Sequence, residues 1–155
     1  GKAEGANRAA RGRAKIALVA VLALTPGKDF QARDVRIFRP YRDEIPWELM
    51  SSAEQPAPEF SDATLVRVAK FADAVVGVYA IRPLSPLAFR LEVLVVTKAF
   101  RRRGVGRWLL GHAIGLAESK GGRELAVSDG QARRFFLSTG FVVCDGGLKL
   151  TFTPE

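Results

Sequence analysis

LEVLVVTKAFRRRGVGRWLL, residues 91–110, joins a hydrophobic run, a basic turn and an amphipathic segment in that order. The hydrophobic run predicts a strand over residues 88–97 that lies centrally in a sheet. From Gly104 onward, apolar residues recur with the period of a helix, which we expect to end near Gly121. The first amides of a helix have no partners inside it, and the glycines Gly104 and Gly106 let an anion approach the backbone closely. This stretch therefore predicts a binding site for a phosphate.

Arginines surround the same turn and narrow the class of ligand. Their positive charge suits a diphosphate, and they are Arg101, Arg102, Arg103 and Arg107. The turn lacks the Gly-x-Gly-x-x-Gly of dinucleotide-binding folds and the Gly-Lys-Ser/Thr of nucleoside-triphosphate loops. A solvated basic turn is the alternative interpretation. The order of strand, basic turn, Gly-x-Gly and amphipathic helix argues against it.

Strands and helices follow one another along the chain in a pattern typical of an α/β fold with a mixed sheet. The pattern predicts six or seven strands with helices on both faces, and the unit over residues 88–128 predicts a right-handed βαβ crossover with parallel strands. Pro83 and Pro86 predict a loop ahead of that unit. The expected strands are 35–39, 64–71, 74–81, 88–97, 124–128, 141–144 and 148–153, and the expected helices are 41–52, interrupted near Pro46, 104–119 and 131–138.

Length and charge limit the class of protein. The chain has 155 residues, enough for one domain, and a net charge of +8. Half of that excess lies in residues 1–15, so we expect a basic and apolar N-terminal appendage over residues 1–30 and a single domain over residues 31–155. No nucleic-acid-binding signature accompanies the charge, and the aromatic residues are not interleaved with basic ones. Both observations argue against nucleic acid as the partner.

Apolar and cysteine content argue against a membrane protein and a metal site. The apolar stretch 16–24 has nine residues, too few to cross a bilayer. The single cysteine, Cys144, cannot form an internal disulfide, which favours a reducing compartment and a cytoplasmic protein. One cysteine and one histidine cannot assemble the usual zinc site, so we expect no metal.

The turn at the start of the helix resembles a motif of a known family. Arg101-x-x-Gly104-x-Gly106 matches the Q/R-x-x-G-x-G/A acetyl-CoA motif of the GCN5-related N-acetyltransferases, the GNAT family. Leu94-Val95-Val96, just before it, looks like the "LAV" strand that precedes the motif in that family. The resemblance implies acetyl-CoA as co-substrate.

A second motif, near the C-terminus, strengthens the resemblance. ARRFFLSTGF, residues 132–141, is similar to the A-x-x-F-Y-x-x-x-G-F ending of the family. The resemblance covers residues 64–153, and ahead of them only IFRP at 37–40 is similar to the family's "I-R-P" opening. It implies the GNAT fold, a sheet splayed between the strands near 88–97 and 124–128, with the cofactor in the opening.

The resemblance also implies which residues contact the cofactor. Backbone amides of residues 102–106 would hold the pyrophosphate, and backbone groups of Leu94 and Val96 would bond the pantetheine arm. The cofactor-binding residues implied are Leu94, Val95, Val96, Arg101, Arg102, Arg103, Gly104, Val105, Gly106 and Arg107.

The catalytic side departs from the family pattern. Phe136 stands where the family often has a tyrosine that protonates the departing thiolate, and Asp129 stands where an asparagine is common. We expect Asp129 to cap the following helix. Acetylation needs a neutral amine, and Glu92, in the central strand, is the candidate base. The alternative for Glu92 is a structural ion pair with Arg90 or Arg67.

Three other polar side chains are weaker candidates. Ser128 and Tyr79 could donate a proton, whereas His112 lies inside the cofactor helix, where a structural role is expected. We predict an acetyltransferase that moves the acetyl group to a primary amine by direct attack. Its acceptor would be a small molecule or a peptide, and the protein a monomer or homodimer.

A protein without catalytic activity is the alternative. The family includes an acetyl-CoA sensor that binds a protein partner, a maturation factor for an aspartate decarboxylase of pantothenate synthesis. Its motif region is similar to TKAFRRRGVGRWLL, and it also ends in a Gly-Phe strand and a Gly-Gly turn, as Phe141 and Gly146-Gly147 do here. The missing tyrosine favours this alternative, and the length of the chain counts against it.

Overall fold

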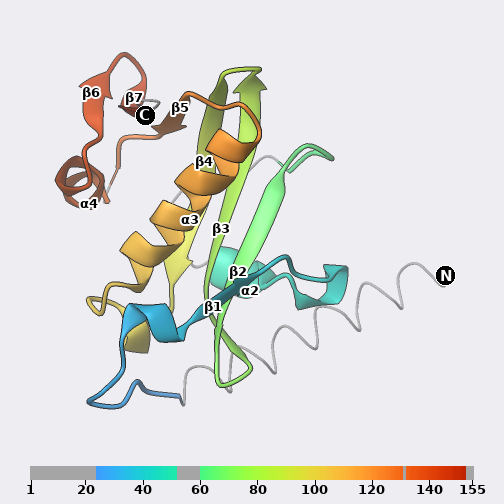
Figure 1. Ribbon diagram of the computed structural model, residues 1–155, viewed down its shortest axis with the longest axis vertical. Helices are drawn as coiled ribbons and strands as arrows, with labels where there is room; N and C mark the ends of the chain where they lie inside the picture. Colours follow the sequence, from blue (N-terminus) through green and yellow to red (C-terminus); the bar gives the residue numbers. More distant parts are fainter. Residues whose placement is uncertain (1–23, 52–59, 131, 153–155) are drawn as a thin grey trace, which may run out of the picture.

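A seven-stranded sheet organises the part of the chain that the computed structural model describes, residues 24–51, 60–130 and 132–152 (Figure 1). Its strand order is β1-β2-β3-β4-β5-β7-β6. The strands are β1 (Arg36–Phe38), β2 (Leu65–Phe71), β3 (Ala74–Ser85), β4 (Ala88–Val96), β5 (Glu124–Val127), β6 (Val142–Cys144) and β7 (Gly147–Thr151). The helices are α2 (Trp47–Ser51), α3 (Val105–Ser119) and α4 (Arg133–Ser138), with 3-10 turns η1 (Ala32–Asp34), η2 (Arg42–Glu44) and η3 (Lys98–Phe100).

The sheet opens between its two central strands. β4 and β5 are parallel and joined through α3, as expected, whereas the other neighbouring strands pair antiparallel. Pairing between β4 and β5 ends at Arg90 and Ala126, although β4 continues to Val96. The expected mixed, splayed sheet is therefore confirmed, and the second half of β4 has β3 as a neighbour but not β5.

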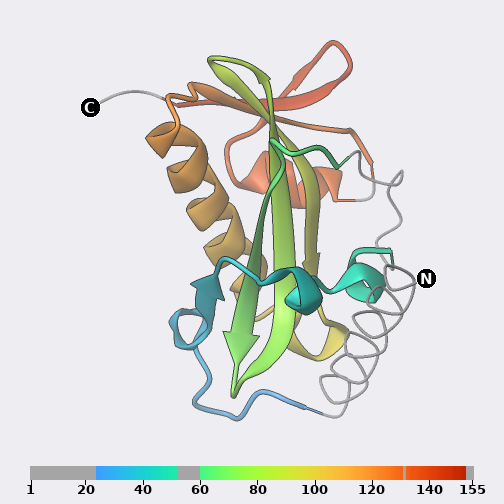
Figure 2. The same cartoon turned by 90° about the vertical axis from the view of Figure 1, so that its right-hand side faces the viewer.

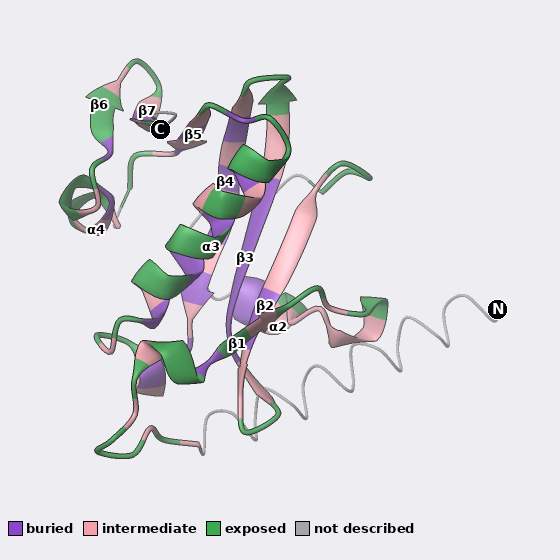
Figure 3. Ribbon diagram, viewed as in Figure 1, coloured by how far each residue is buried: buried purple, intermediate pink, exposed green. Residues whose placement is uncertain are grey.

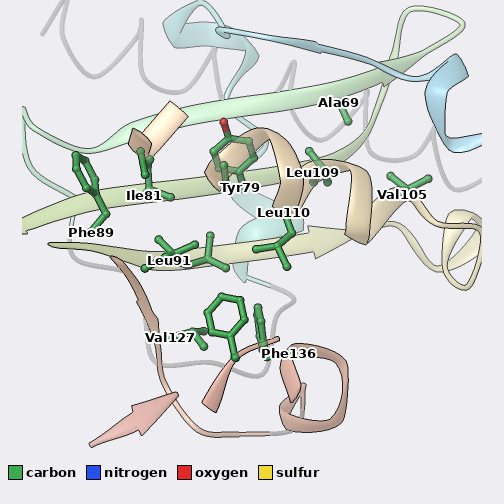
Figure 4. Packing of buried hydrophobic residues seen from close by; sticks show 14 of the residues in the cluster. Ala69, Tyr79, Ile81, Phe89, Leu91, Val105, Leu109, Leu110, Val127 and Phe136 are labelled. Carbon is green, nitrogen blue, oxygen red and sulfur yellow. The ribbon is translucent and has the colours of Figure 1, made fainter. Parts of the chain in front are cut away.

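Helices cover both faces of the sheet. α3 packs on one face, where Leu109 and Ala113 join Tyr79, Ile81 and other side chains in the larger hydrophobic cluster (Figures 3 and 4). α2 packs on the opposite face, so that α3 and α2 lie on either side of the strands (Figures 1 and 2). There Leu49 and Met50 contact a second cluster that includes Val78, Val93 and Val95.

One expected loop is part of the sheet. β3 runs through Pro83 to Ser85, so the loop expected around Pro83 and Pro86 is shortened to a turn at residues 86–87. β2 pairs with β3 only as far as Ile81, and beyond it β3 pairs with β4 alone. Pro83 therefore lies at a sheet edge, where proline's missing N–H leaves no neighbour unsatisfied.

The segment before β1 is tied to the domain. Phe30 packs edge-on against Phe71 and Phe100, with ring centroids 5.2 and 5.3 Å apart. Residues 1–23 of the expected appendage lie outside the described residues, and its boundary at residue 30 stays a prediction. Among the helices that the structure describes, none has the length and hydropathy needed to cross a membrane.

Candidate functional site

A pocket of about 360 Å³ lies where the chain enters α3. It draws on three elements, the end of β4, the first turn of α3, and α4, and so lies at the opening of the sheet. Its lining residues are Val96, Arg101, Arg102, Gly104, Gly106, Arg107 and Phe135. All but Phe135 belong to the group that the sequence singled out for cofactor binding.

The two glycines of the pocket have different reasons to be glycine. Gly104 has φ +86, a left-handed conformation that strains any other residue, and it is the residue that precedes the first turn of α3. Gly106 is helical, and a Cβ added there would meet only the ring of Phe135, at 3.6 Å. Its lack of a side chain thus keeps the pocket open rather than relieving strain.

The arginines around the turn are not equivalent. Arg101 donates from Nε to the carbonyl of Val96 at 3.0 Å, and Arg107 donates to the Ser138 hydroxyl at 3.3 Å, so both are held beside the pocket. Arg103 points elsewhere: it donates to the carbonyl of Gly27 at 3.0 Å, and its guanidinium lies 5.4 Å from the centre of the Phe30 ring. Its side chain anchors the N-terminal segment.

Three other cofactor candidates contribute little side chain to this pocket. Val105 is 1% exposed in the core beneath α3, and Val95 packs in the cluster under α2. Leu94 is partly buried against the cluster on the α3 face.

Glu92 lies at an irregularity of the central strand. Ile81 pairs with Leu91 but its neighbour Ala80 pairs with Val93, so Glu92 is an extra residue on β4, a β-bulge. The bulge turns Val93 toward α2, although Leu91 faces α3. Such a residue re-aims the side chains around it, and here it sets the acidic group just past the point where β4 and β5 separate.

The carboxylate of Glu92 is largely shielded from solvent and ion-paired. Its side chain is 9% exposed, and its Oε1 lies 2.9 Å from both Nε and Nη2 of Arg82. Nε of Arg90 is 3.6 Å from the same oxygen. Arg90 was the partner expected for a structural ion pair, whereas Arg67 instead donates to the Val66 carbonyl. Arg82 was missed because it falls in the segment expected to be a loop.

Arg90 also reaches across the opening. Its Nη2 donates to the hydroxyl of Ser128, the residue that follows β5. The expectation that Asp129 caps α4 is wrong. α4 has no side-chain cap, and the Asp129 carboxylate pairs with Arg133 one turn further on. A charged partner within reach competes with the backbone amides for the same carboxylate.

The remaining polar candidates lie within or beside the core. Tyr79 is fully buried between the sheet and α3, and its hydroxyl is 2.6 Å from Nδ1 of His112 (Figure 4). Burial raises the pKa of the Tyr79 hydroxyl, and burial together with Arg67 lowers the pKa of His112. The structural role expected for His112 agrees with this contact.

Phe136 is packed away from solvent. It is 2% exposed, and its ring lies 5.1 Å from that of Phe141 and 5.2 Å from that of Phe135. Phe135, the preceding residue, lines the pocket. Phe135 thus lines the pocket, and Phe136 fills the core.

A family model decides the class of protein. The model described as "Acetyltransferase (GNAT) domain" matches residues 62–143, more than half of the chain. The chain belongs to the GNAT acetyltransferase family. Its matched region contains β2 to β5, α3 and α4, the elements that form the pocket and the opening of this GNAT domain.

Solved structures show the same fold. An acetyl-CoA-bound GNAT acetyltransferase from Elizabethkingia anophelis is 19% identical, with a TM-score of 0.62 over 72% of this chain and 78% of that one. An IAA acetyltransferase from Bacillus cereus is 25% identical, with a TM-score of 0.59 over 71% and 78%. The ribosomal-protein-S18-alanine N-acetyltransferase from Escherichia coli is 17% identical, with a TM-score of 0.62 over 78% and 96%. No curated protein sequence matches this GNAT chain.

Within the described ranges, no group of three or more His, Cys, Asp or Glu side chains is placed to hold a metal ion.

Proposed function

We propose that this GNAT domain binds acetyl-CoA in the pocket and transfers the acetyl group to a primary amine. One observation carries the proposal: the pocket joins the end of β4, the first turn of α3 and α4, the elements that border the opening of the sheet. A long, flexible thioester can thus enter beside the helix and lie along an unpaired strand edge.

Different groups of the chain suit different parts of the co-substrate. The amides of residues 102–106 lie in the turn before α3 and at its first residues, where the helix dipole favours an anion, and Arg101, Arg102 and Arg107 add charge for the diphosphate. Beyond Arg90, no strand in the described part of the chain pairs with the edge of β4 toward β5, so its backbone can bond the amides of the pantetheine arm. We place this contact at Leu94 to Val96.

The transfer is a direct displacement. The neutral amine nitrogen attacks the thioester carbon, the C–N bond forms, the C–S bond breaks, and the CoA sulfur leaves as a thiolate that finally takes up the proton given up by the amine. Glu92 would accept the proton that the amine loses, directly or through a water molecule. Its ion pair with Arg82 holds the carboxylate in one orientation near the opening, where positioning supplies much of the rate.

Filling the pocket tests cofactor binding. Gly106→Val places methyl groups against Phe135 without backbone strain, because Gly106 is helical and an added Cβ would make only ordinary contacts. Gly111→Val is the matched control, since Gly111 is in the same helix with no atom within 4 Å of an added Cβ. We expect calorimetric affinity for acetyl-CoA to fall at least roughly tenfold in Gly106→Val alone. Equal affinities in the two variants would contradict the placement of the co-substrate.

Removing the carboxylate tests catalysis. Glu92→Gln keeps the shape of the side chain, and we expect kcat for thiol release to fall by roughly 10²–10⁴-fold with acetyl-CoA affinity unchanged. A variant as active as the parent, on an amine that the parent acetylates, would remove Glu92 from the mechanism.

Phe136 favours a second candidate function. With no hydroxyl to protonate the departing thiolate, the domain could bind acetyl-CoA as a signal and present it to a protein partner. Tight binding of acetyl-CoA, no thiol release with any amine, and a partner that binds only the loaded protein would establish this function instead.

A further inference from the structure

A row of cationic side chains crosses the sheet beside Glu92. Arg82 on β3 is directly opposite Arg90 on β4, Arg90 is opposite Ala126 on β5, and Ala126 is opposite Lys149 on β7. Directly opposed residues point to the same face of a sheet. This face is the one that Glu92 shares, away from α3.

Arg90 has the longer of the two arginine contacts with the neighbouring carboxylate of Glu92. Like charges directly opposite one another destabilise a pair of strands unless something of opposite charge lies between them. One carboxylate oxygen of Glu92 takes the short contacts from Arg82, and Arg90 is left at 3.6 Å. Arg82 makes at least one further interaction, so the inference rests on Arg90.

Arg90 has both donors and access for a ligand. Its described contacts are the Ser128 hydroxyl and the distant Glu92 oxygen, and a guanidinium has more N–H donors than these two contacts use. Its side chain is 32% exposed, whereas that of Glu92 is 9% exposed. A planar guanidinium that solvent reaches is suited to a carboxylate.

The position of Arg90 relates this anion site to the reaction. Arg90 and Ala126 are the last paired residues before the sheet opens, and Glu92 follows within the opening. An acceptor whose amine approaches Glu92 therefore has its neighbouring atoms close to Arg90. In an α-amino acid, the amino and carboxylate groups are attached to one carbon, which matches this spacing.

We propose that the acceptor is an α-amino acid whose carboxylate is bound by Arg90 while its amine faces Glu92. A polyamine or a lysine-rich peptide would bring further positive charge against this row of cations. The inference rests on the proposed acetyl transfer for its setting, but binding alone can test it.

The test compares pairs of ligands that differ in a single charge. The probes are the N-acetyl derivatives of alanine, phenylalanine and glutamate and the matching α-amides, titrated calorimetrically into the full chain saturated with CoA. We expect at least one acid to bind roughly tenfold to hundredfold more tightly than its amide, because a charge-assisted hydrogen bond is lost in the amide.

Variants then assign the preference to Arg90. Arg90→Gln should reduce the acid-to-amide ratio to below about twofold and leave the amide affinity unchanged, while Arg90→Lys should retain part of the ratio. Lys149→Gln is the matched control, because it removes a charge from the same row but beyond Ala126, where Lys149 already pairs with Glu124. Thermal melting confirms that each variant is folded.

The outcomes separate this inference from the proposed function. If CoA itself does not bind, the proposed function fails and the acceptor site fails with it. If CoA binds but acids and amides bind equally, or neither binds, only the acceptor inference is overturned. A preference that survives Arg90→Gln, or is lost equally in Lys149→Gln, also overturns it.

Discussion

The hydrogen bond between Tyr79 and His112 allows the contact between the sheet and α3 to be tested through protein stability, without an activity assay. The Tyr79 hydroxyl is fully buried, whereas His112 lies on the exposed side of the contact. The two partners therefore differ in what their removal leaves behind. Tyr79→Phe leaves a histidine that water can reach, and His112→Leu leaves a hydroxyl that water cannot.

The expected changes in the free energy of unfolding follow from this difference in exposure between Tyr79 and His112. Tyr79→Phe removes one neutral hydrogen bond, which lowers the free energy of unfolding by about 1 kcal/mol. His112→Leu covers the hydroxyl with a side chain that cannot accept a hydrogen bond, which costs about 1–3 kcal/mol. In the His112→Leu background, Tyr79→Phe should instead stabilise the protein, because it removes the unsatisfied group. The effect of Tyr79→Phe on stability therefore has opposite signs in the two backgrounds.

Urea unfolding of the four proteins of this double-mutant cycle measures the effect. Far-UV circular dichroism follows the transition, and m-values must agree for the free energies to be compared. His112→Gln is the conservative control, since an amide oxygen can still accept from the hydroxyl. If Tyr79→Phe destabilises both backgrounds by the same amount, the hydrogen bond is not the interaction that couples the two residues.

The burial of His112 predicts a pH dependence of the stability. Burial, and then the charge of Arg67, lower the pKa of His112 below 6.5, so the folded state favours the neutral ring. Above pH 6.5, His112 is neutral in both the folded and the unfolded state, and its contribution to stability is fully present. As the pH falls below 6.5, His112 of the unfolded chain binds a proton first, and this contribution is lost. The lowered carboxyl pKa of Glu44 acts only below its ordinary value of 4.5. In His112→Gln, the urea midpoint should therefore depend less on pH between about pH 5 and 7 than in the parent. An equal dependence in the two proteins would refute the assignment of this effect to His112.

Three further substitutions have definite expected results. Gly115→Ala should raise the free energy of unfolding by about 1 kcal/mol, because Gly115 is inside α3 and no atom lies within 4 Å of an added Cβ; a lower urea midpoint would show that this helix face is already covered. Arg103→Ala should cost about 1 kcal/mol by releasing the carbonyl of Gly27 and the ring of Phe30, while calorimetric affinity for acetyl-CoA changes by less than about twofold; a larger loss would make the side chain a ligand. Phe136→Tyr should raise kcat for thiol release by roughly 10²-fold if the missing hydroxyl limits the transfer, and an unchanged rate in a folded variant would assign proton donation to another group.

Local sequence predicted the fold and the turn that lines the pocket. The turn over residues 101–106 is contiguous, and its glycines and arginines lie within one strand–turn–helix unit, so no long-range contact is needed to bring them together. The strands on either side follow from hydrophobic runs, and their boundaries differ from the structure by a residue or two. Such elements carry their own signal because period and turn chemistry are properties of neighbouring residues.

Elements that depend on pairing partners escaped prediction. Pro83 indicates a loop in any local interpretation, and only the early end of β2 at Leu65 makes its place in β3 acceptable. Arg103 looks like a phosphate ligand in sequence, yet its side chain binds Gly27, a residue far from it along the chain. Phe135 lines the pocket only because α4 packs beside the first turn of α3.

The arginines and the glutamate on the acceptor side of the site show why some features could be predicted from local sequence and others could not. Arg82, Arg90 and Glu92 come together only because β3 and β4 pair in one register, interrupted by a bulge. Since side chains alternate across a strand, a register shifted by one residue would send Arg90 to the α3 face and separate it from Glu92. The proposed diphosphate site would survive that shift, because most of its residues belong to a single turn. The proposed co-substrate site is thus encoded locally and the proposed acceptor site by the sheet register, which is why the acceptor is best tested at Arg90.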